Sequence, residues 1–185
     1  TGAVIINGTV TEGQTLTVSN TLVDEDGLGL VAYQWQQNGV DVPGETGTTY
    51  TLDQNDVGTT ISARATYTDG YGSDESVTST GTAPVLNVND APTGAVSISG
   101  TVTEGQTLTA SNTLDDQDGM GIVTYQWQQD GVNITGATGG SYTLVQNDVG
   151  TVISVIASYT DGEGTNENVS SAGTVSVSDL PLFDL

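Results

Sequence analysis

The sequence predicts an all-β protein that consists of two tandem β-sandwich domains. The chain repeats itself: Thr101–Thr109 copies Thr9–Thr17, so the two copies are offset by 92 residues. Within each copy Thr, Val, Ile and Tyr alternate with polar residues, and Gly, Asn or Asp interrupts the pattern at about the 8–12-residue spacing typical of short sandwich strands. No segment shows helical periodicity over three turns. We therefore expect one domain at residues 1–90 and a second at residues 91–185, with a linker at about residues 86–92, here called the joint.

Two strands are clear in each copy. Residues 61–67 place Ile, Ala, Ala and Tyr on one face, and residues 153–159 keep a similar apolar face while the other face varies. Residues 31–37 place Val31, Tyr33 and Trp35 on one side. This strand runs into Asn38-Gly39, and its copy runs into Asp130-Gly131, which are both strong hairpin-turn dipeptides. These features predict a sandwich whose inner face is lined by Trp and Tyr.

The charge of the chain excludes several classes of function. The 185 residues include 23 acidic residues, one cation (Arg64), no His and no Cys, for a formal net charge of −22. Nucleic acids and anionic membrane surfaces need Lys and Arg clusters, which the chain lacks. No apolar run approaches the length of a membrane span. We expect a monomer that is not inserted in a membrane.

The same composition predicts that the protein is not an enzyme. Without His or Cys the usual nucleophilic triads cannot be built, and zinc lacks its preferred ligands. Paired carboxylates could hydrolyse glycosides, but here they lie in turns that are duplicated in both copies, as expected of a scaffold.

The order of motifs resembles immunoglobulin-like domains. Trp35, Gly39, the Thr48–Leu52 run and the Asp56-Val57-Gly58 corner match the segment of that family from strand C to strand F, and the second copy repeats the match from Trp127 to Gly150. The resemblance implies a Greek-key sandwich with the Trp in the core between the sheets. The cysteine pair of that family is absent, so packing alone must join the sheets.

More narrowly, three motifs resemble the tandem repeats of large bacterial surface adhesins that are secreted by type I systems (RTX adhesins). These motifs are the Thr-Glu-Gly-Gln-Thr-Leu opening, the Tyr-Gln-Trp-Gln core and the Tyr-Thr-Asp-Gly end of each copy. The resemblance implies extender domains arranged end to end in a secreted protein at the cell surface. It also implies that neighbouring repeats are the direct partners and that a distal domain binds the adhesion target in biofilm formation.

Acidic residues mark a candidate calcium site at the joint. If the strand order is immunoglobulin-like, the chain leaves the first domain beside Glu12 and Asp56, and it enters the second beside Asp116, Asp118 and Asp161. The joint itself adds Asn87, Asn89 and Asp90. This oxygen-only set suits a hard cation such as Ca²⁺, which takes six to eight oxygen ligands.

The set is similar to the calcium sites of cadherins, in which a Glu, an Asn-Asp linker and an Asp-x-Asp of the next repeat hold the ions. Asn89-Asp90-Ala91-Pro92 and Asp116-Gln117-Asp118 match those motifs, whereas Asn87 stands where cadherins usually carry Asp. The resemblance implies one or two ions rather than three. The residues leave open whether the ions lie between the domains or within one of them.

Each acid also has a simpler interpretation as a turn residue. Asp-Gly pairs form turns through their own side-chain hydrogen bonds, and Asp56 could serve only to fix the corner before the next strand. The functional hypothesis is a structural extender that calcium stiffens. The alternatives are a carbohydrate- or protein-binding module, for which Tyr71 is the only aromatic loop candidate, and an accessory domain of a secreted hydrolase.

Overall fold

The chain folds into two compact β modules, each described here by itself. The computed structural model describes residues 1–180, so the last five residues that the sequence assigns to the second domain, 181–185, lie outside it. The first module is Thr1–Val88 and the second begins at Asn89, so the division falls inside the predicted joint. In the described part of the chain no helix has the length and apolar character needed to cross a bilayer.

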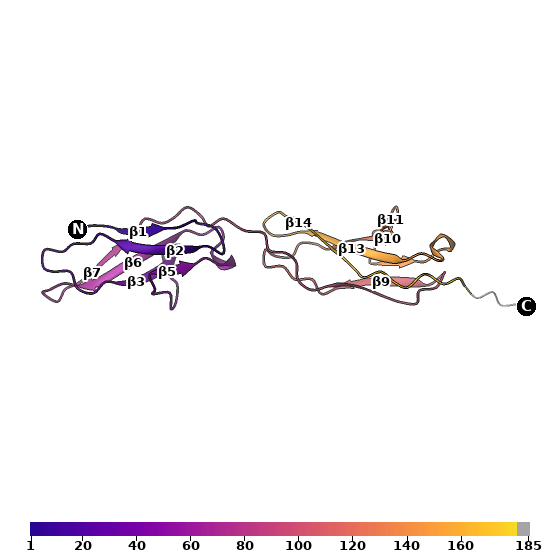
Figure 1. The fold of residues 1–185 in the computed structure, drawn as a ribbon, viewed down its shortest axis with the longest axis horizontal. Helices are drawn as coiled ribbons and strands as arrows, with labels where there is room; N and C mark the ends of the chain where they lie inside the picture. The colour runs from indigo at the N-terminus through magenta and orange to yellow at the C-terminus, as the bar shows by residue number, and fades with distance from the viewer. Residues whose placement is uncertain (181–185) are drawn as a thin grey trace, which may run out of the picture. The chain divides into compact units, whose positions relative to one another are not determined.

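In the first module two antiparallel sheets form (Figure 1). The three-stranded sheet has the order β1-β2-β5, and its strands are Val4–Asn7, Thr15–Asn20 and Thr49–Thr51. The four-stranded sheet has the order β4-β3-β6-β7, and its strands are Val40–Asp41, Ala32–Gln37, Ile61–Thr68 and Asp74–Thr78. One 3₁₀ turn, η1 (Gln54–Asp56), precedes β6.

The second module repeats this plan. Its three-stranded sheet has the order β12-β9-β8, with strands Ser141–Thr143, Thr107–Asn112 and Val96–Ser99. Its four-stranded sheet has the order β11-β10-β13-β14, with strands Val132–Asn133, Thr124–Gln129, Ile153–Thr160 and Asn166–Ser170. The turn η2 (Gln146–Asp148) precedes β13. Both modules are therefore immunoglobulin-like Greek-key sandwiches, as the sequence predicts.

The hairpin turns have the backbone that their sequences predict. Asn38 and Gly39 both have positive φ, 49° and 79°, and Asp130 and Gly131 have 47° and 80°. Two successive residues with positive φ define a type I′ turn, whose twist matches that of the flanking strands. The turns connect β3 to β4 and β10 to β11 in register.

After its last named strand, each chain copy continues as a segment that pairs both with the residues just before the long strand β6 or β13 and with the start of its own module. Leu86 forms a parallel bridge with Thr11, and Val85 forms one with Val57. The Leu86 amide donates to the Val10 carbonyl at 3.0 Å, and the Glu12 amide donates to the Leu86 carbonyl at 2.9 Å. Ser178 repeats both bonds in the second module. This last segment closes each sandwich at the pole where the chain leaves it.

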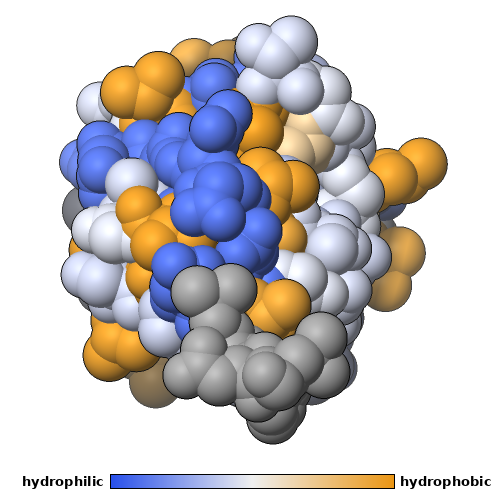
Figure 2. Space-filling view, turned by 90° about the vertical axis from the view of Figure 1, so that its right-hand side faces the viewer, coloured by the Kyte–Doolittle hydropathy of each residue, from blue (hydrophilic) through white to orange (hydrophobic). Residues whose placement is uncertain are grey.

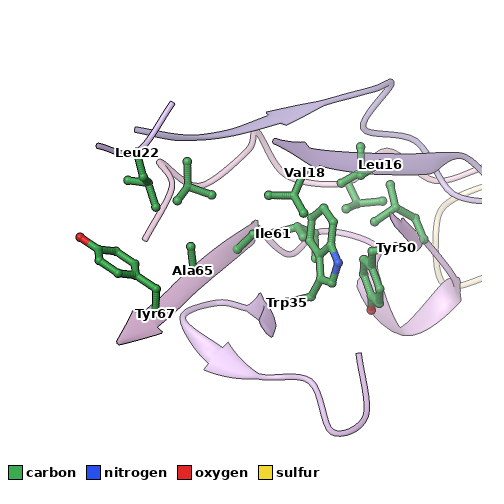
Figure 3. Packing of buried hydrophobic residues seen from close by; sticks show 12 residues of the cluster. Leu16, Val18, Leu22, Trp35, Tyr50, Ile61, Ala65 and Tyr67 are labelled. Carbon is green, nitrogen blue, oxygen red and sulfur yellow. The ribbon is translucent and has the colours of Figure 1, made fainter. Parts of the chain in front are cut away.

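A Trp lies at the centre of each core. Trp35 is fully buried, stacks on Tyr50 with ring centroids 5.5 Å apart, and donates its indole N–H to the Gly47 carbonyl at 2.9 Å. Figure 3 shows its ring beside Ile61 of β6 and Tyr50 of β5, with Val18 and Leu16 of β2 above it. Trp127 takes the same place in the second module, 5.9 Å from Tyr142. Burial of such large rings supplies cohesion where the related fold often has a disulfide.

Inward and outward residues alternate as the sequence predicts. Along β6, Ile61, Ala63, Ala65 and Tyr67 are buried, while Thr66 and Thr68 are exposed. Ser62 on the outer face is also buried, and its hydroxyl donates to Gln36. Arg64 lies on the outer face and pairs with Asp41 at 2.7 Å. On the face that Figure 2 shows, hydrophobic residues are interspersed with hydrophilic ones.

Candidate metal centre

The acidic pole of the second module is built by two loops that glycines hold together. The Gly162 amide donates to the carbonyls of Asp118 and Gly119, at 2.9 and 3.2 Å. A Cβ on Gly121 would lie 2.0 Å from the Thr160 carbonyl oxygen, and a Cβ on Gly162 would lie 2.5 Å from the Asp118 carbonyl oxygen. Only glycine allows this approach, so the loop after β9 and the loop after β13 meet at a fixed distance.

Three carboxylates converge at this pole. One oxygen each from Asp116, Asp161 and Glu167 lies within 4.8 Å of the other two. Asp116 is 8% exposed and Asp161 is 6% exposed, and Glu167 is half-buried. Three negative groups at this distance repel one another unless a cation or a proton lies between them.

The two carboxylate oxygens of Asp161 differ in their surroundings. Oδ1 accepts hydrogen bonds from the amides of Glu163 and Thr165, at 2.9 and 2.7 Å. Oδ2 is buried and has no hydrogen-bond partner. Burying an anionic oxygen without a hydrogen-bond partner costs free energy of folding. A bound ion is one way in which such an oxygen can be satisfied.

Asp116 is held through both of its carboxylate oxygens. Oδ1 accepts the Asp118 amide at 2.9 Å, and Oδ2 accepts the Tyr159 hydroxyl at 2.5 Å. Tyr159 is buried, and its burial together with the hydrogen bond to Asp116 raises its pKa above the usual value. The phenol therefore stays protonated at neutral pH and acts as a donor to Asp116.

The predicted joint residues Asn89 and Asp90 lie against the same pole. The Asn89 side-chain amide donates to Glu167 Oε1 at 2.9 Å, and the Asp90 backbone amide donates to Asp118 Oδ2 at 2.7 Å. The structure thus brings together five of the eight residues predicted as metal ligands, all within the second module: Asn89, Asp90, Asp116, Asp118 and Asp161.

The other three predicted ligands belong to the first module. Glu12 Oε2 accepts the Val88 amide at 3.2 Å, and Asn87 has a buried Oδ1 with no hydrogen-bond partner. Asp56 is 1% exposed, and its carboxylate accepts hydrogen bonds from Tyr50, Gln37 and the Asp53 amide. For Asp56 these contacts support the simpler interpretation, in which the side chain fixes the corner before β6.

The matching pole of the first module is organised differently. Tyr67 donates to Asp24 Oδ2 at 2.9 Å, as Tyr159 does to Asp116, and this bond is the main cause of a raised Tyr67 pKa. Asp69 accepts backbone bonds from Tyr71 and Ser73, and these bonds keep its pKa below the usual value, with the Ser73 bond the larger cause. In residues 1–88, all of which the structure describes, Asp24, Asp69 and Glu75 form no close carboxylate group. Tyr71, the aromatic loop candidate for a binding module, is 84% exposed.

Glu167 is the site residue that the sequence prediction missed. It lies opposite Tyr159 in the β13–β14 pairing, so its side chain emerges on the same face of the sheet as that of Tyr159. Asp161 follows Tyr159 by two residues, just beyond the end of β13. The signal was present, because Glu75 and Glu167 are both acidic at an offset of 92 residues. Only the register of β13 and β14 shows that the Glu167 side chain reaches the cluster.

Comparisons with known proteins give no family name. No protein-family model matches the chain. No curated protein matches it.

Solved structures with distant similarity are tandem modules. The three N-terminal domains of the bacteriophage RB49 Highly Immunogenic Outer Capsid protein (Hoc) align at 18% identity and TM-score 0.32, over 92% of this chain and 58% of that one. The Clostridium thermocellum CbhA fibronectin(III)-like modules align at 17% identity and TM-score 0.34, over 95% of this chain and 94% of that one. The tandem Ig repeats of Dlar align at 13% identity and TM-score 0.29, over 97% of this chain and 98% of that one. The chain spans little more than half of the Hoc structure.

The sheet topology defines the chain as a tandem pair of immunoglobulin-like modules. The second of them carries a carboxylate cluster at the pole where the chain enters.

Proposed function

We propose that this chain is an extender segment of a bacterial cell-surface adhesin, in which calcium holds the joint to the entry pole of the second module. The stalk projects a distal adhesive domain away from the cell in adhesion and biofilm formation. The observation that carries the metal proposal is Asp161 Oδ2, a buried oxygen without a partner in a residue whose carboxylate belongs to the three-carboxylate cluster.

The chemistry of the cluster favours calcium over other cations. All the candidate ligands are oxygens, which hard cations prefer, and His and Cys are absent from the chain. Several carboxylates supply more negative charge than a water-rich Mg²⁺ site usually collects. A bound Ca²⁺ would neutralise the repulsion among Asp116, Asp161 and Glu167 and give the Asp161 oxygen a partner.

The same ion would act on the joint, because joint residues share the pole with the cluster. Asn89 is hydrogen-bonded to Glu167, which is a candidate ligand, and Asp90 is hydrogen-bonded to Asp118. Holding these residues in place restricts rotation about the backbone bonds of the segment between the modules, so this segment becomes stiffer. Without calcium we expect unrelieved repulsion to loosen these contacts.

Calcium titration of the whole chain tests the metal site. Calcium at 100 times its Kd should stabilise the module that binds it by about 2.7 kcal/mol, which corresponds to a rise in Tm of about 10–20 °C. Asp161→Asn should weaken calcium binding at least tenfold. The matched control is Asp130→Asn, which removes one charge from the same module and installs the residue that the first copy carries as Asn38. Equal affinity in the two variants would contradict the site.

Small-angle scattering with calcium and with chelator tests the extender role. The expected result is a longer and stiffer particle with calcium, and Asp118→Ala, which removes the acceptor of the Asp90 amide, should abolish the change. A rise in Tm with unchanged scattering would mean that calcium stabilises the module without stiffening the joint. If neither changed, the acids would be ordinary turn residues and the calcium proposal would be wrong.

A further inference from the structure

We infer that Tyr159 is a positioning residue of the metal centre, which orients the Asp116 carboxylate for the ion through its hydroxyl. This inference rests on the calcium site proposed above. It concerns a residue that contributes no ligand atom and that lies in the core of the module.

Tyr159 is connected to each member of the carboxylate cluster. It donates a hydrogen bond to Asp116, it faces Glu167 across the β13–β14 pairing, and it precedes Asp161 by two residues on the same strand end. It is 4% exposed, so the surrounding core holds its ring in place. Of the three carboxylates, that of Asp116 is the one that Tyr159 holds directly, through its hydroxyl.

The hydrogen bond fixes the direction of the Asp116 carboxylate. With Oδ1 held by the Asp118 amide and Oδ2 by Tyr159, rotation of the group about its terminal torsion would break two bonds. The remaining lone pairs of the carboxylate then keep one direction before an ion arrives. Partners of this kind, which orient the ligands of a metal, typically change metal affinity 10–100-fold when they are removed.

The first module supplies a matched comparison. Tyr67 donates to Asp24 in the same way and pairs with Glu75 at the same register, but the acids around it do not converge. Loss of the hydroxyl there removes a hydrogen bond at the pole without touching the cluster. Comparing the two tyrosines therefore separates the contribution of the tyrosine–aspartate hydrogen bond to module stability from its contribution to calcium affinity.

The test uses the whole chain with Tyr159→Phe and Tyr67→Phe, each measured by calorimetric calcium titration and by thermal melting in chelator. Tyr159→Phe should raise the calcium Kd at least tenfold, while Tyr67→Phe leaves the affinity of this site within twofold of the wild type. In chelator both variants should lower the Tm of their own module. A Tyr159→Phe chain that melts at a lower temperature yet binds calcium with wild-type affinity would overturn the inference and leave the proposed function standing.

A spectroscopic readout on the unaltered chain covers the case in which Tyr159→Phe does not fold. Calcium should produce a near-ultraviolet difference spectrum of tyrosine, which Tyr67→Phe retains. Calcium that binds the unaltered chain with no tyrosine difference spectrum would also overturn the inference. If the unaltered chain does not bind calcium at all, both the proposed function and this inference fail together.

Discussion

The Tyr50 hydroxyl donates to Asp56 at 2.9 Å from both carboxylate oxygens, inside the first module. The bond joins the end of the three-stranded sheet to the 3₁₀ turn before β6, and Asp56 also receives the Asp53 amide at 3.1 Å. Burial, followed by this hydrogen bond, raises the pKa of Tyr50. Tyr142 and Asp148 repeat the contact in the second module at 2.9 Å.

Removing the corner carboxylate should destabilise a module and leave metal binding intact. Asp56→Ala leaves the hydroxyl of Tyr50 and the backbone N–H of Asp53 without their acceptor, at a cost of about 2–4 kcal/mol in the free energy of unfolding. Urea unfolding measures this cost. The control Asp53→Val removes an exposed charge nearby and installs the residue that the second copy has at Val145, so about 1 kcal/mol is expected. A changed calcium Kd in Asp56→Ala would restore Asp56 to the list of ligands.

Stability should fall at high pH. Burial, and then the hydrogen bond to Asp148, raises the pKa of Tyr142 from 10.0 to about 12. Between these values the folded module binds more protons than the unfolded chain, so its stability is complete below pH 10 and declines as pH rises toward 12. Urea unfolding of the second module at a series of pH values would show the decline. Tyr142→Phe should reduce the slope, and an unchanged slope would contradict the assignment.

The glycine contact between the two loops should be essential for the metal centre. A Cβ on Gly121 would lie 2.0 Å from the Thr160 carbonyl oxygen, so Gly121→Ala must separate the loops that carry Asp116 and Asp161. We expect a loss of about 2–3 kcal/mol in stability and weaker calcium binding. The control is Gly140→Ala in the same module, because a Cβ there meets nothing within 4 Å and the first copy carries Thr48 at that position. Equal calcium affinity in the two variants would show that the loops do not depend on this contact.

The hairpin turn of the first module should accept the residue of the second. Asn38 Oδ1 accepts the Thr60 amide, as Asp130 Oδ1 accepts the Val152 amide, at the same positive φ. Asn38→Asp should therefore change the free energy of unfolding by less than about 0.5 kcal/mol. Asn38→Ala should cost about 1–2 kcal/mol, because a left-handed backbone disfavours Ala and the side-chain bond is lost. Equal effects of the two substitutions in urea unfolding would exclude this explanation.

Local chemistry explains why much of the fold could be predicted. The alternation along β6 and the Asn38-Gly39 turn depend on neighbours in sequence, and the structure confirms both, with β6 extending to Thr68. The repeat at 92 residues carries each inference to the second copy. The candidate site was harder, because its members come from loops that only the tertiary fold brings together.

Two residues show where sequence reasoning stopped. Asp56 and Asp161 are both acidic turn residues, but a tyrosine faces the carboxylate of the first, and the second keeps one oxygen without a partner. Glu167 enters the cluster only through the register of β13 and β14. Partners across a sandwich and the register after a turn are set by packing, which one sequence does not display.

The parallel bridge near each exit pole also determines how a module would respond to tension. The segment around Thr11 and the one around Leu86 run in the same direction, so a pull on the two chain ends slides one along the other. Their hydrogen bonds are then loaded together instead of opening one after another as in a zipper. Once these hydrogen bonds break and the module unfolds, its 88 residues extend to a chain about 300 Å long. A series of such modules under tension would therefore lengthen in steps, one module at a time.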